Sequence, residues 1–293
     1  MGGLMRKTLL GALAALAAGC WGESAMALDL SPNDYVHLPD GTFVLVNYFN
    51  YVEGDTFRDK DGNKIPGSKD RLAFGIERLV YYGETDSGFE WAMQAVMPYG
   101  SINARIGGVD ADTENGTSDL TLGTAFWAMS SNEPTGTTLG SSTYLILPVG
   151  QYDPLKPSMG AGAVGIVEQI GLQQGLGNGF VLDLAGDIHY RFDHTDNGIE
   201  VSQKPIYQIQ AFLRYNINEA ASISFGYSGL FGGKQTYNGF DTGLRTREDQ
   251  FRLYATTFVS PTIQLQGMVG TDVYAKGGFQ QDLVTQLRIV KLF

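Results

Sequence analysis

The feature of this sequence that most constrains its fold is a repeated alternation of apolar and polar side chains with a period of two residues. From about Thr42 onward the chain divides into segments of roughly ten to thirteen residues, separated by turn residues. The segment Ile206–Ile217 is the clearest example. One of its faces carries Tyr207, Ile209, Ala211, Leu213 and Tyr215. Because no helical period of 3.6 residues competes after residue 27, these segments are predicted to be strands.

The length of the segments favours a membrane barrel over a soluble β-protein. Strands of globular proteins are most often about 5–6 residues long, whereas a tilted strand that crosses a membrane needs roughly 9–11. Short turns such as Asn218–Glu219 alternate with long loops such as Asp193–Pro205, as in outer-membrane barrels. Five short turns and six long loops join twelve strands. The sequence predicts an all-β, transmembrane, antiparallel up-and-down β-barrel over residues 42–293, with both termini in the periplasm.

Aromatic side chains recur near the ends of the predicted strands. In outer-membrane barrels such rings form girdles at the level of the lipid headgroups, where one end of the ring system is apolar and the other meets water. We expect this position for Trp91, Tyr99, Trp127, Tyr144, Tyr190, Tyr215, Tyr227 and Phe251.

The start of the chain has the pattern of a secretory signal peptide. Arg6 and Lys7 precede the apolar run Thr8–Gly19, and Ala25-Met26-Ala27 offers the small residues that signal peptidase accepts. The apolar run is shorter than the roughly 20 residues that a membrane helix needs. Residues 1–27 are therefore predicted to be a signal peptide that exports the chain towards the outer membrane of a Gram-negative bacterium.

A second interpretation of this segment stays open. Ala17-Ala18-Gly19-Cys20 is similar to a lipoprotein cleavage box, which would leave Cys20 lipidated at the mature N-terminus. Cleavage after Ala27 would instead leave a mature chain without cysteine, which excludes thiol chemistry and disulfides. Either way, residues 28–41 are predicted to be a short periplasmic segment before the barrel.

The overall charge restricts the partners of the chain. The formal net charge is −11, which argues against nucleic acid because a phosphate backbone requires a positive surface. The expected partners are the lipid bilayer with lipopolysaccharide, the barrel-assembly machinery, and small hydrophobic or aromatic solutes.

The last predicted strand, Asp282–Phe293, ends on an aromatic residue. A terminal strand that ends in this way is the signal that the barrel-assembly machinery reads, so Phe293 is assigned to that role. Leu287 and Ile289 are in phase with Phe293, but Lys291 stands where an apolar residue is usual. The cost is small, because a lysine at the headgroup level can extend its ammonium into water.

The polar faces of the strands supply the candidate functional residues. A charge on the lipid side would cost about 2–4 kcal/mol at the bilayer midplane, so polar faces are expected to line the lumen. The candidate set is Asp183, Asp187, His189, Arg191, Gln208, Gln210, Arg214, Arg252, Gln264 and Gln266. These residues would either line an open pore or bond to one another in a packed interior, as in small barrels.

Two segments outside the strands are candidates for a gate or a metal site. Leu28–Asp40 is too short for a folded plug, so any constriction must come from in-folded loops, lumen side chains or this tail reaching inside. Asp59–Asn63 is similar to the opening of a calcium loop but lacks the later bidentate glutamate, so we interpret it as a solvated turn. No metal or cofactor is predicted.

Catalysis has little support in the sequence. Lipolytic outer-membrane barrels use a serine–histidine pair at the lipid face, whereas His189 falls on the predicted lumen side and His194 in a loop. A triad needs a nucleophile within hydrogen-bond reach of its base. No serine is placed to meet His189, so we expect no enzyme and keep a lipase as a minor alternative.

Short patches along the whole chain resemble one family. They are Asp34-Tyr35-Val36, Leu38–Thr42, Pro148–Asp153, Leu182-Asp183-Leu184, Gly186-Asp187, Pro205–Ala211, Leu213–Tyr215, Gly226–Ser228, Thr257–Thr262 and Lys291–Phe293. In these the chain resembles the outer-membrane transporters named after the meta-pathway of phenol degradation (phenol MetA degradation family). The resemblance implies a porin-like barrel for passive uptake of small hydrophobic or aromatic compounds. The alternative is a closed structural or adhesive barrel without transport.

Overall fold

The computed structural model describes residues 28–131 and 133–293, and consists of strands joined by turns and loops. The predicted signal peptide, residues 1–27, and the alternative lipidation site Cys20 lie outside the described residues. Within the described part of the chain, no helix is long and apolar enough to cross a membrane.

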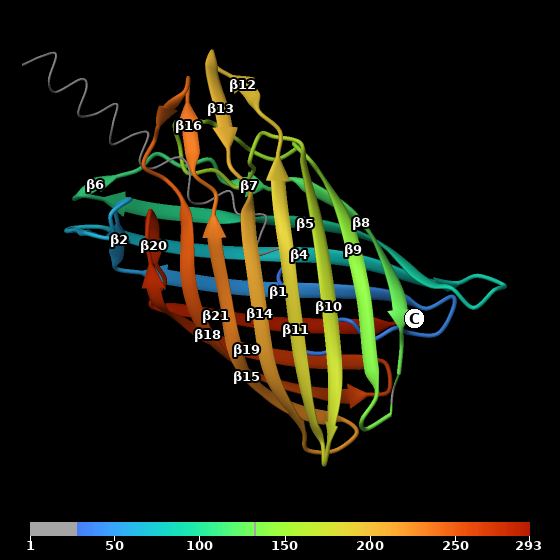
Figure 1. The fold of residues 1–293 in the computed structure, drawn as a ribbon. Coiled ribbons are helices and arrows are strands. Elements are labelled where there is room, and N and C mark those ends of the chain that lie inside the picture. Colours follow the sequence, from blue (N-terminus) through green and yellow to red (C-terminus); the bar gives the residue numbers. More distant parts are fainter. Residues whose placement is uncertain (1–27, 132) are drawn as a thin grey trace, which may run out of the picture.

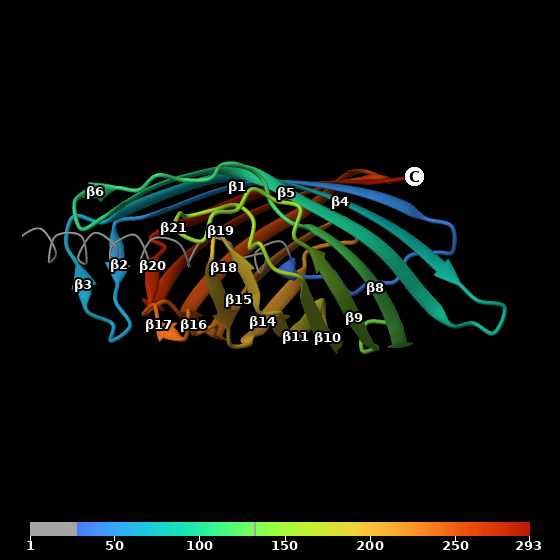
Figure 2. The same cartoon turned by 90° about the horizontal axis from the view of Figure 1, so that it is seen from above.

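Twelve long antiparallel strands form one closed barrel (Figures 1 and 2). Each strand pairs with the next one along the chain, and β1 pairs with both β4 and β21, which closes the sheet. The predicted barrel of about 12 strands is confirmed. The strands are β1 (Phe43–Gly54), β4 (Lys69–Glu84), β5 (Glu90–Ile106), β8 (Leu120–Met129), β9 (Thr137–Leu147), β10 (Gly165–Gly177), β11 (Phe180–Arg191), β14 (Ile206–Asn216), β15 (Ala221–Gly232), β18 (Thr246–Ser260), β19 (Ile263–Ala275) and β21 (Leu283–Leu292).

The two faces of the barrel wall differ in polarity as the alternation predicts. In β14, Ile209 and Leu213 point outward and are exposed, whereas Gln208 and Gln210 point inward and are 1% exposed. A wall with this much outward apolar surface needs lipid around it, because soluble proteins rarely expose large contiguous apolar patches. The two-residue period therefore sets which side chains meet the bilayer and which meet the lumen.

The aromatic prediction is wrong at two positions. Trp127 and Tyr144 are 6% and 2% exposed and lie on the inward faces of β8 and β9. Both side chains have polar atoms that hydrogen-bond inside the barrel, to the carbonyl of Tyr35 and to Gln94 respectively. Tyr99, Tyr190, Tyr215 and Phe251 are exposed on the outer face.

The long loops carry additional strands that the sequence does not reveal. Because successive long strands are antiparallel, all six long loops lie at one end of the barrel. The start of β1 and the end of β21 lie at the other end. Figure 1 shows β12, β13 and β16 rising beyond the wall. The additional strands are β2 (Thr56–Arg58), β3 (Lys64–Ile65), β6 (Val109–Asp110), β7 (Gly116–Thr117), β12 (His194–Asp196), β13 (Ile199–Gln203), β16 (Gln235–Tyr237), β17 (Phe240–Asp241) and β20 (Gly278–Gln280).

Replacing Ile209 by arginine tests the assignment of the outward face to lipid. Ile209 is 51% exposed near the middle of β14. The substitution should lower the free energy of unfolding by about 2–4 kcal/mol, the cost of a cation at the bilayer midplane. Denaturant titration of the barrel in liposomes measures it. The control Glu219→Arg changes an exposed turn residue and should cost about 0–1 kcal/mol. Equal effects of the two substitutions would contradict a lipid-facing Ile209.

Candidate functional site

Two of the predicted lumen residues form an ion pair near the end of the barrel that carries the short turns. Arg214 on β14 donates from Nε to Oδ2 of Asp183 on β11 at 2.9 Å and from Nη2 to Oδ1 at 3.2 Å. Gln173 Nε2 on β10 donates to Oδ1 of the same carboxylate at 2.7 Å. Both charged side chains are more than nine-tenths buried. This fork-shaped pair satisfies a buried charge with the geometry that arginine and carboxylate favour.

A second pair lies on the same inward face of β11. His189 Nε2 and Asp187 Oδ1 are 2.6 Å apart, and Gln169 Nε2 donates to Asp187 Oδ2 at 3.2 Å. Within the described residues, no serine hydroxyl hydrogen-bonds to His189. The His189–Asp187 contact joins two residues of β11, and the hydrogen bond from Gln169 connects this pair to β10.

The remaining predicted residues divide into two groups. Three of them bond to the segment that precedes β1: Gln208, Gln210 and Arg252. The other three lie away from those contacts: Arg191, Gln264 and Gln266. Arg191 donates to Gln203 at 3.0 Å, and Gln266 donates to Thr256 at 2.9 Å. The predicted set therefore forms separate groups along the lumen, and the group of Gln208, Gln210 and Arg252 contacts the segment that precedes β1.

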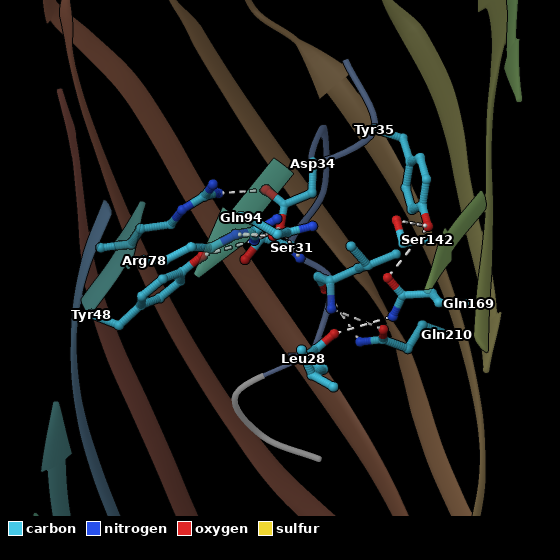
Figure 3. A network of polar contacts seen from close by, with 12 residues as sticks. Leu28, Ser31, Asp34, Tyr35, Tyr48, Arg78, Gln94, Ser142, Gln169 and Gln210 are labelled. Carbon is cyan, nitrogen blue, oxygen red and sulfur yellow. Dashed lines mark hydrogen bonds and ion pairs between the residues drawn. The ribbon is translucent and has the colours of Figure 1, made fainter. Parts of the chain in front are cut away.

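The segment before β1 lies inside the barrel. The sequence predicts a periplasmic position for residues 28–41, but residues 28–37, here called the tail, run through the lumen (Figure 3). The backbone N–H of Leu30 donates to Gln210 Oε1 at 3.1 Å, and Gln210 Nε2 donates back to the Leu30 carbonyl at 3.2 Å. Gln169 Nε2 donates to the Leu28 carbonyl at 3.1 Å. Side-chain amides of the wall thus satisfy backbone groups that have no strand partner.

Two carboxylates of the tail meet three arginines of the wall. Asp29 Oδ2 lies 2.7 Å from Arg252 Nη2 on β18, and Asp29 Oδ1 accepts a hydrogen bond from Gln208 Nε2. Asp34 Oδ1 lies 2.8 Å from Arg288 Nη1 on β21, and its Oδ2 lies 3.7 Å from Arg78 Nη1 on β4. All of these charged side chains are at least 86% buried. Removing one partner of such a buried pair is costly, because the other charge remains without compensation.

Tyr35 fits a slot made by two glycines. Gly140 on β9 and Gly171 on β10 are register partners with inward positions. A Cβ atom would lie 2.7 Å from the Tyr35 ring at Gly140 and 2.1 Å from it at Gly171. The Tyr35 hydroxyl lies 3.1 Å from Ser142 Oγ, and Trp127 Nε1 donates to the Tyr35 carbonyl at 2.8 Å. The wall is therefore shaped for this ring, since any larger residue at either glycine would collide with it.

The tail packs tightly on one side of its turn, whereas a cavity of about 350 Å³ remains between Asn33 and the turn that joins β14 and β15. The cavity beside its turn, bounded by Asn33, Asp183 and Phe212, has a volume of about 10 Å³. That is at most the roughly 10–15 Å³ that one water molecule needs. The chain leaves the lumen past His37, whose Nδ1 lies 3.3 Å from Glu90 and whose ring packs edge-on against Trp127. The tail is thus a packed plug anchored at its β1 end.

Loops cover the opposite end of the lumen with apolar side chains. Phe57, Met159, Leu244 and Phe279 come from four different loop segments and are at most 8% exposed in one cluster. Asp119 fixes one of these loops by accepting hydrogen bonds from the backbone of Gly150 at 3.0 Å and of Ala161 at 2.7 Å. Burial raises the pKa of its carboxyl. Apolar loop side chains thus meet at one end of the barrel, and the tail occupies the lumen.

Neither a metal site nor a calcium loop is present in the described part of the chain. No group of three or more histidine, cysteine, aspartate or glutamate side chains is placed to hold a metal ion there. Asp59 accepts the backbone N–H groups of Asp61 and Asn63 at 2.9 and 2.8 Å, which closes an exposed turn. The hydrogen bond from the Asn63 side-chain amide at 3.1 Å, together with these backbone groups, holds the pKa of Asp59 below its usual range.

Sequence reasoning missed the ion pairs between tail and wall. Arg252 belongs to the predicted set, but Asp29, Asp34, Arg78 and Arg288 do not. A signal existed for Arg288, because it alternates with Leu287 and Ile289 and so falls on the lumen face. Nothing in the spacing of residues pairs the tail with particular strands, since these contacts join positions far apart in the chain.

Substituting Gly171 by alanine should expel Tyr35 from its slot. The added Cβ would lie 2.1 Å from the ring, so the tail must move or leave. Ser31 is 7% exposed, and a cysteine there, in a Cys20→Ala background, reports the change by its rate of maleimide labelling. We expect Gly171→Ala to raise that rate at least about tenfold, which corresponds to a shift of about 1.4 kcal/mol towards the released tail.

The matched control is Gly186→Ala on the neighbouring strand β11. Its Cβ would have no neighbour nearer than 3.9 Å, so the tail should stay in place and the labelling rate should not change. Equal rates in Gly171→Ala, Gly186→Ala and the parent protein would contradict the packed position of Tyr35.

The geometry agrees with comparisons to known proteins. The crystal structure of the COG4313 outer membrane channel from Pseudomonas putida F1 matches with a TM-score of 0.82 and 25% sequence identity, over 90% of this chain and 100% of that chain. The transport unit of the autotransporter AIDA-I from Escherichia coli shares the fold, with a TM-score of 0.50 and 9% identity over 91% of this chain and 95% of that chain. No curated protein sequence matches this chain. The family described as "Putative MetA-pathway of phenol degradation" matches residues 54–289, and the chain belongs to this family.

Proposed function

We propose that the protein is a passive outer-membrane channel for small hydrophobic or aromatic compounds, and that the tail is its gate. The main support for this proposal is that the tail occupies the lumen. Residues 28–37 occupy it as a separate segment, held by hydrogen bonds and ion pairs and joined to the barrel only through β1. A barrel closed for structural reasons alone needs only the side chains of its own wall, as small barrels use.

The chemistry of the contacts suits a reversible gate. The hydrogen bonds and ion pairs between tail and wall join polar or charged atoms, whose partners water and solute can replace once the tail moves. Ordering the tail costs conformational entropy, which opposes these contacts. The wall is already complete without the tail, because its strands pair all the way round. Release of the tail therefore leaves the strand pairing of the barrel intact and empties the lumen beneath the loops.

The likeness to the COG4313 outer membrane channel supports transport over the alternatives. The family description, which refers to phenol degradation, supports small aromatic compounds as the cargo class. Inward aromatic side chains such as Tyr48, Tyr82 and Phe212 would accommodate such compounds beside polar groups. The competing proposals are a closed structural or adhesive barrel and, with less support, a lipase. The proposed location is the outer membrane, reached through the signal peptide and the barrel-assembly signal at Phe293.

Deleting residues 28–37 tests the channel directly. In planar bilayers we expect brief, rare openings from the full chain and a larger, steady conductance from the variant, because the lumen loses its packed plug. Since loops also cover the lumen, a second variant combines the deletion with Leu244→Ser and Phe279→Ser. Folding of each barrel is checked by its heat-dependent migration in gels.

The outcomes separate the three proposals. Folded barrels that conduct no current with both the tail and the apolar lid disrupted would support the structural barrel and contradict transport. Ester hydrolysis by the purified full chain would support the lipase.

A further inference from the structure

The wall and the tail are oppositely charged where they meet. Arg78, Arg252 and Arg288 point into the lumen from three strands, and each forms an ion pair with a carboxylate of the tail. Two carboxylates, Asp29 and Asp34, serve these three guanidinium groups. Arg78 and Arg288 therefore share the single carboxylate of Asp34.

The wall offers little other compensation for these arginines. Asp183 is already paired with Arg214, and Asp187 with His189. Gln250 connects Arg252 to Asp272, since it accepts from Arg252 and donates to the Asp272 carboxylate at 2.8 Å. For Arg78 and Arg288, Asp34 is the one carboxylate among the described residues that forms an ion pair. When the tail leaves, these two guanidinium groups lose their counter-charge inside the barrel.

Asp34 does not satisfy all the hydrogen-bond donors of the two arginines that it contacts. Asp34 approaches Arg288 through Nη1, while the buried Nε of Arg288 has no hydrogen-bond partner within the described residues. Its contact with Arg78 is loose at 3.7 Å. A free carboxylate is not restrained by a backbone, so it could accept from Nε and Nη together in the two-pronged geometry that is stronger and more specific. The pair of arginines thus has unused donors for an anion.

Aromatic rings surround this pair of arginines. The guanidinium of Arg288 lies 5.4 Å from the centroid of the Tyr48 ring, and Arg78 Nη1 donates to the Tyr48 hydroxyl at 3.4 Å. Tyr82 and Trp127 are buried on the inward face nearby, with ring centroids 5.9 Å apart. Such a site offers charge for a carboxylate and flat apolar surface for a ring.

We propose that Asp34, with Asp29, occupies an anion site of the lumen, and that the channel's cargo includes small aromatic carboxylates, which displace the tail by replacing its carboxylates. This proposal rests on the proposed channel function and specifies its substrate class. The ligand binds where Arg78 and Arg288 converge, with its ring against Tyr48 and its neighbours. The carboxylate of the cargo then replaces that of Asp34 on Arg78 and Arg288, so binding of the cargo and release of the tail occur together.

Benzoate binding to the full chain in detergent micelles, measured by calorimetry, tests the site without requiring transport. Asp34→Asn removes the competing charge and should tighten benzoate binding at least about tenfold, or about 1.4 kcal/mol. Asp34→Glu keeps the charge and should bind benzoate as the parent protein does. Benzamide, which has the ring without the charge, and acetate, which has the charge without the ring, should each bind at least about tenfold more weakly than benzoate.

Arginine variants locate the site. In the Asp34→Asn background, Arg78→Gln combined with Arg288→Gln should abolish the gain in benzoate affinity. Arg105→Gln removes an exposed loop charge that pairs with Asp110, and should leave the gain unchanged. If the buried variants fail to fold, the Ser31→Cys labelling rate in the otherwise unchanged chain provides the test: benzoate should raise it and benzamide should not.

The results distinguish this proposal from the channel function. Equal binding of benzoate and benzamide, or no gain from Asp34→Asn, would overturn the anion site while leaving a conducting barrel possible. Tight benzoate binding to a barrel that conducts nothing would keep the anion site and contradict the channel. Binding of acetate as tight as that of benzoate would overturn the aromatic part of the substrate class.

Discussion

The structure depends on the need to compensate charge inside a barrel whose outer wall faces lipid. The outward faces of the strands are apolar, so the polar half of each strand is forced inward, where three arginines meet little water. Buried guanidinium groups require counter-charges or hydrogen-bond acceptors. Part of that need is met by residues 28–37, which a soluble periplasmic segment would not provide. The same constraint that orients the strands thereby holds the tail inside.

Two physically different kinds of contact occupy the loop end and the interior of the barrel. At the loop end, Phe57, Met159, Leu244 and Phe279 exclude water with apolar surface. Inside the barrel, hydrogen bonds and ion pairs hold the tail against the wall. Apolar packing is indifferent to which apolar molecule supplies it, whereas ion pairs select by charge and geometry. A hydrophobic solute can therefore pass between the apolar side chains of the loops. Only a polar or anionic group can compete with the tail for the arginines and amides of the wall.

The sequence predicts the barrel but not what fills it. Strand number, the inward and outward faces and the alternation of turns follow from local patterns, such as the two-residue period of Ile206–Ile217, and these agree with the structure. The path of residues 28–37 depends instead on partners more than a hundred positions away, such as Gln210 for Leu30 and Arg288 for Asp34. Local sequence patterns cannot predict the position of Tyr35, because its slot forms only where strand pairing makes Gly140 and Gly171 neighbours. The prediction for Trp127 and Tyr144 is wrong for a related reason. Their positions near strand ends are typical of a headgroup girdle, but the polar atoms of both side chains have hydrogen-bond partners in the lumen.

The position of the tail in a membrane decides whether residues 28–37 close the lumen of the barrel. Asn33 and the turn residue Glu219 border the same cavity at the short-turn end of the barrel. Spin labels at these two positions, in the full chain reconstituted into liposomes, report their separation by electron paramagnetic resonance. A tail packed in the lumen predicts a short and narrow distance distribution. A broad distribution that extends to distances beyond the barrel mouth would contradict it, and with it the gate.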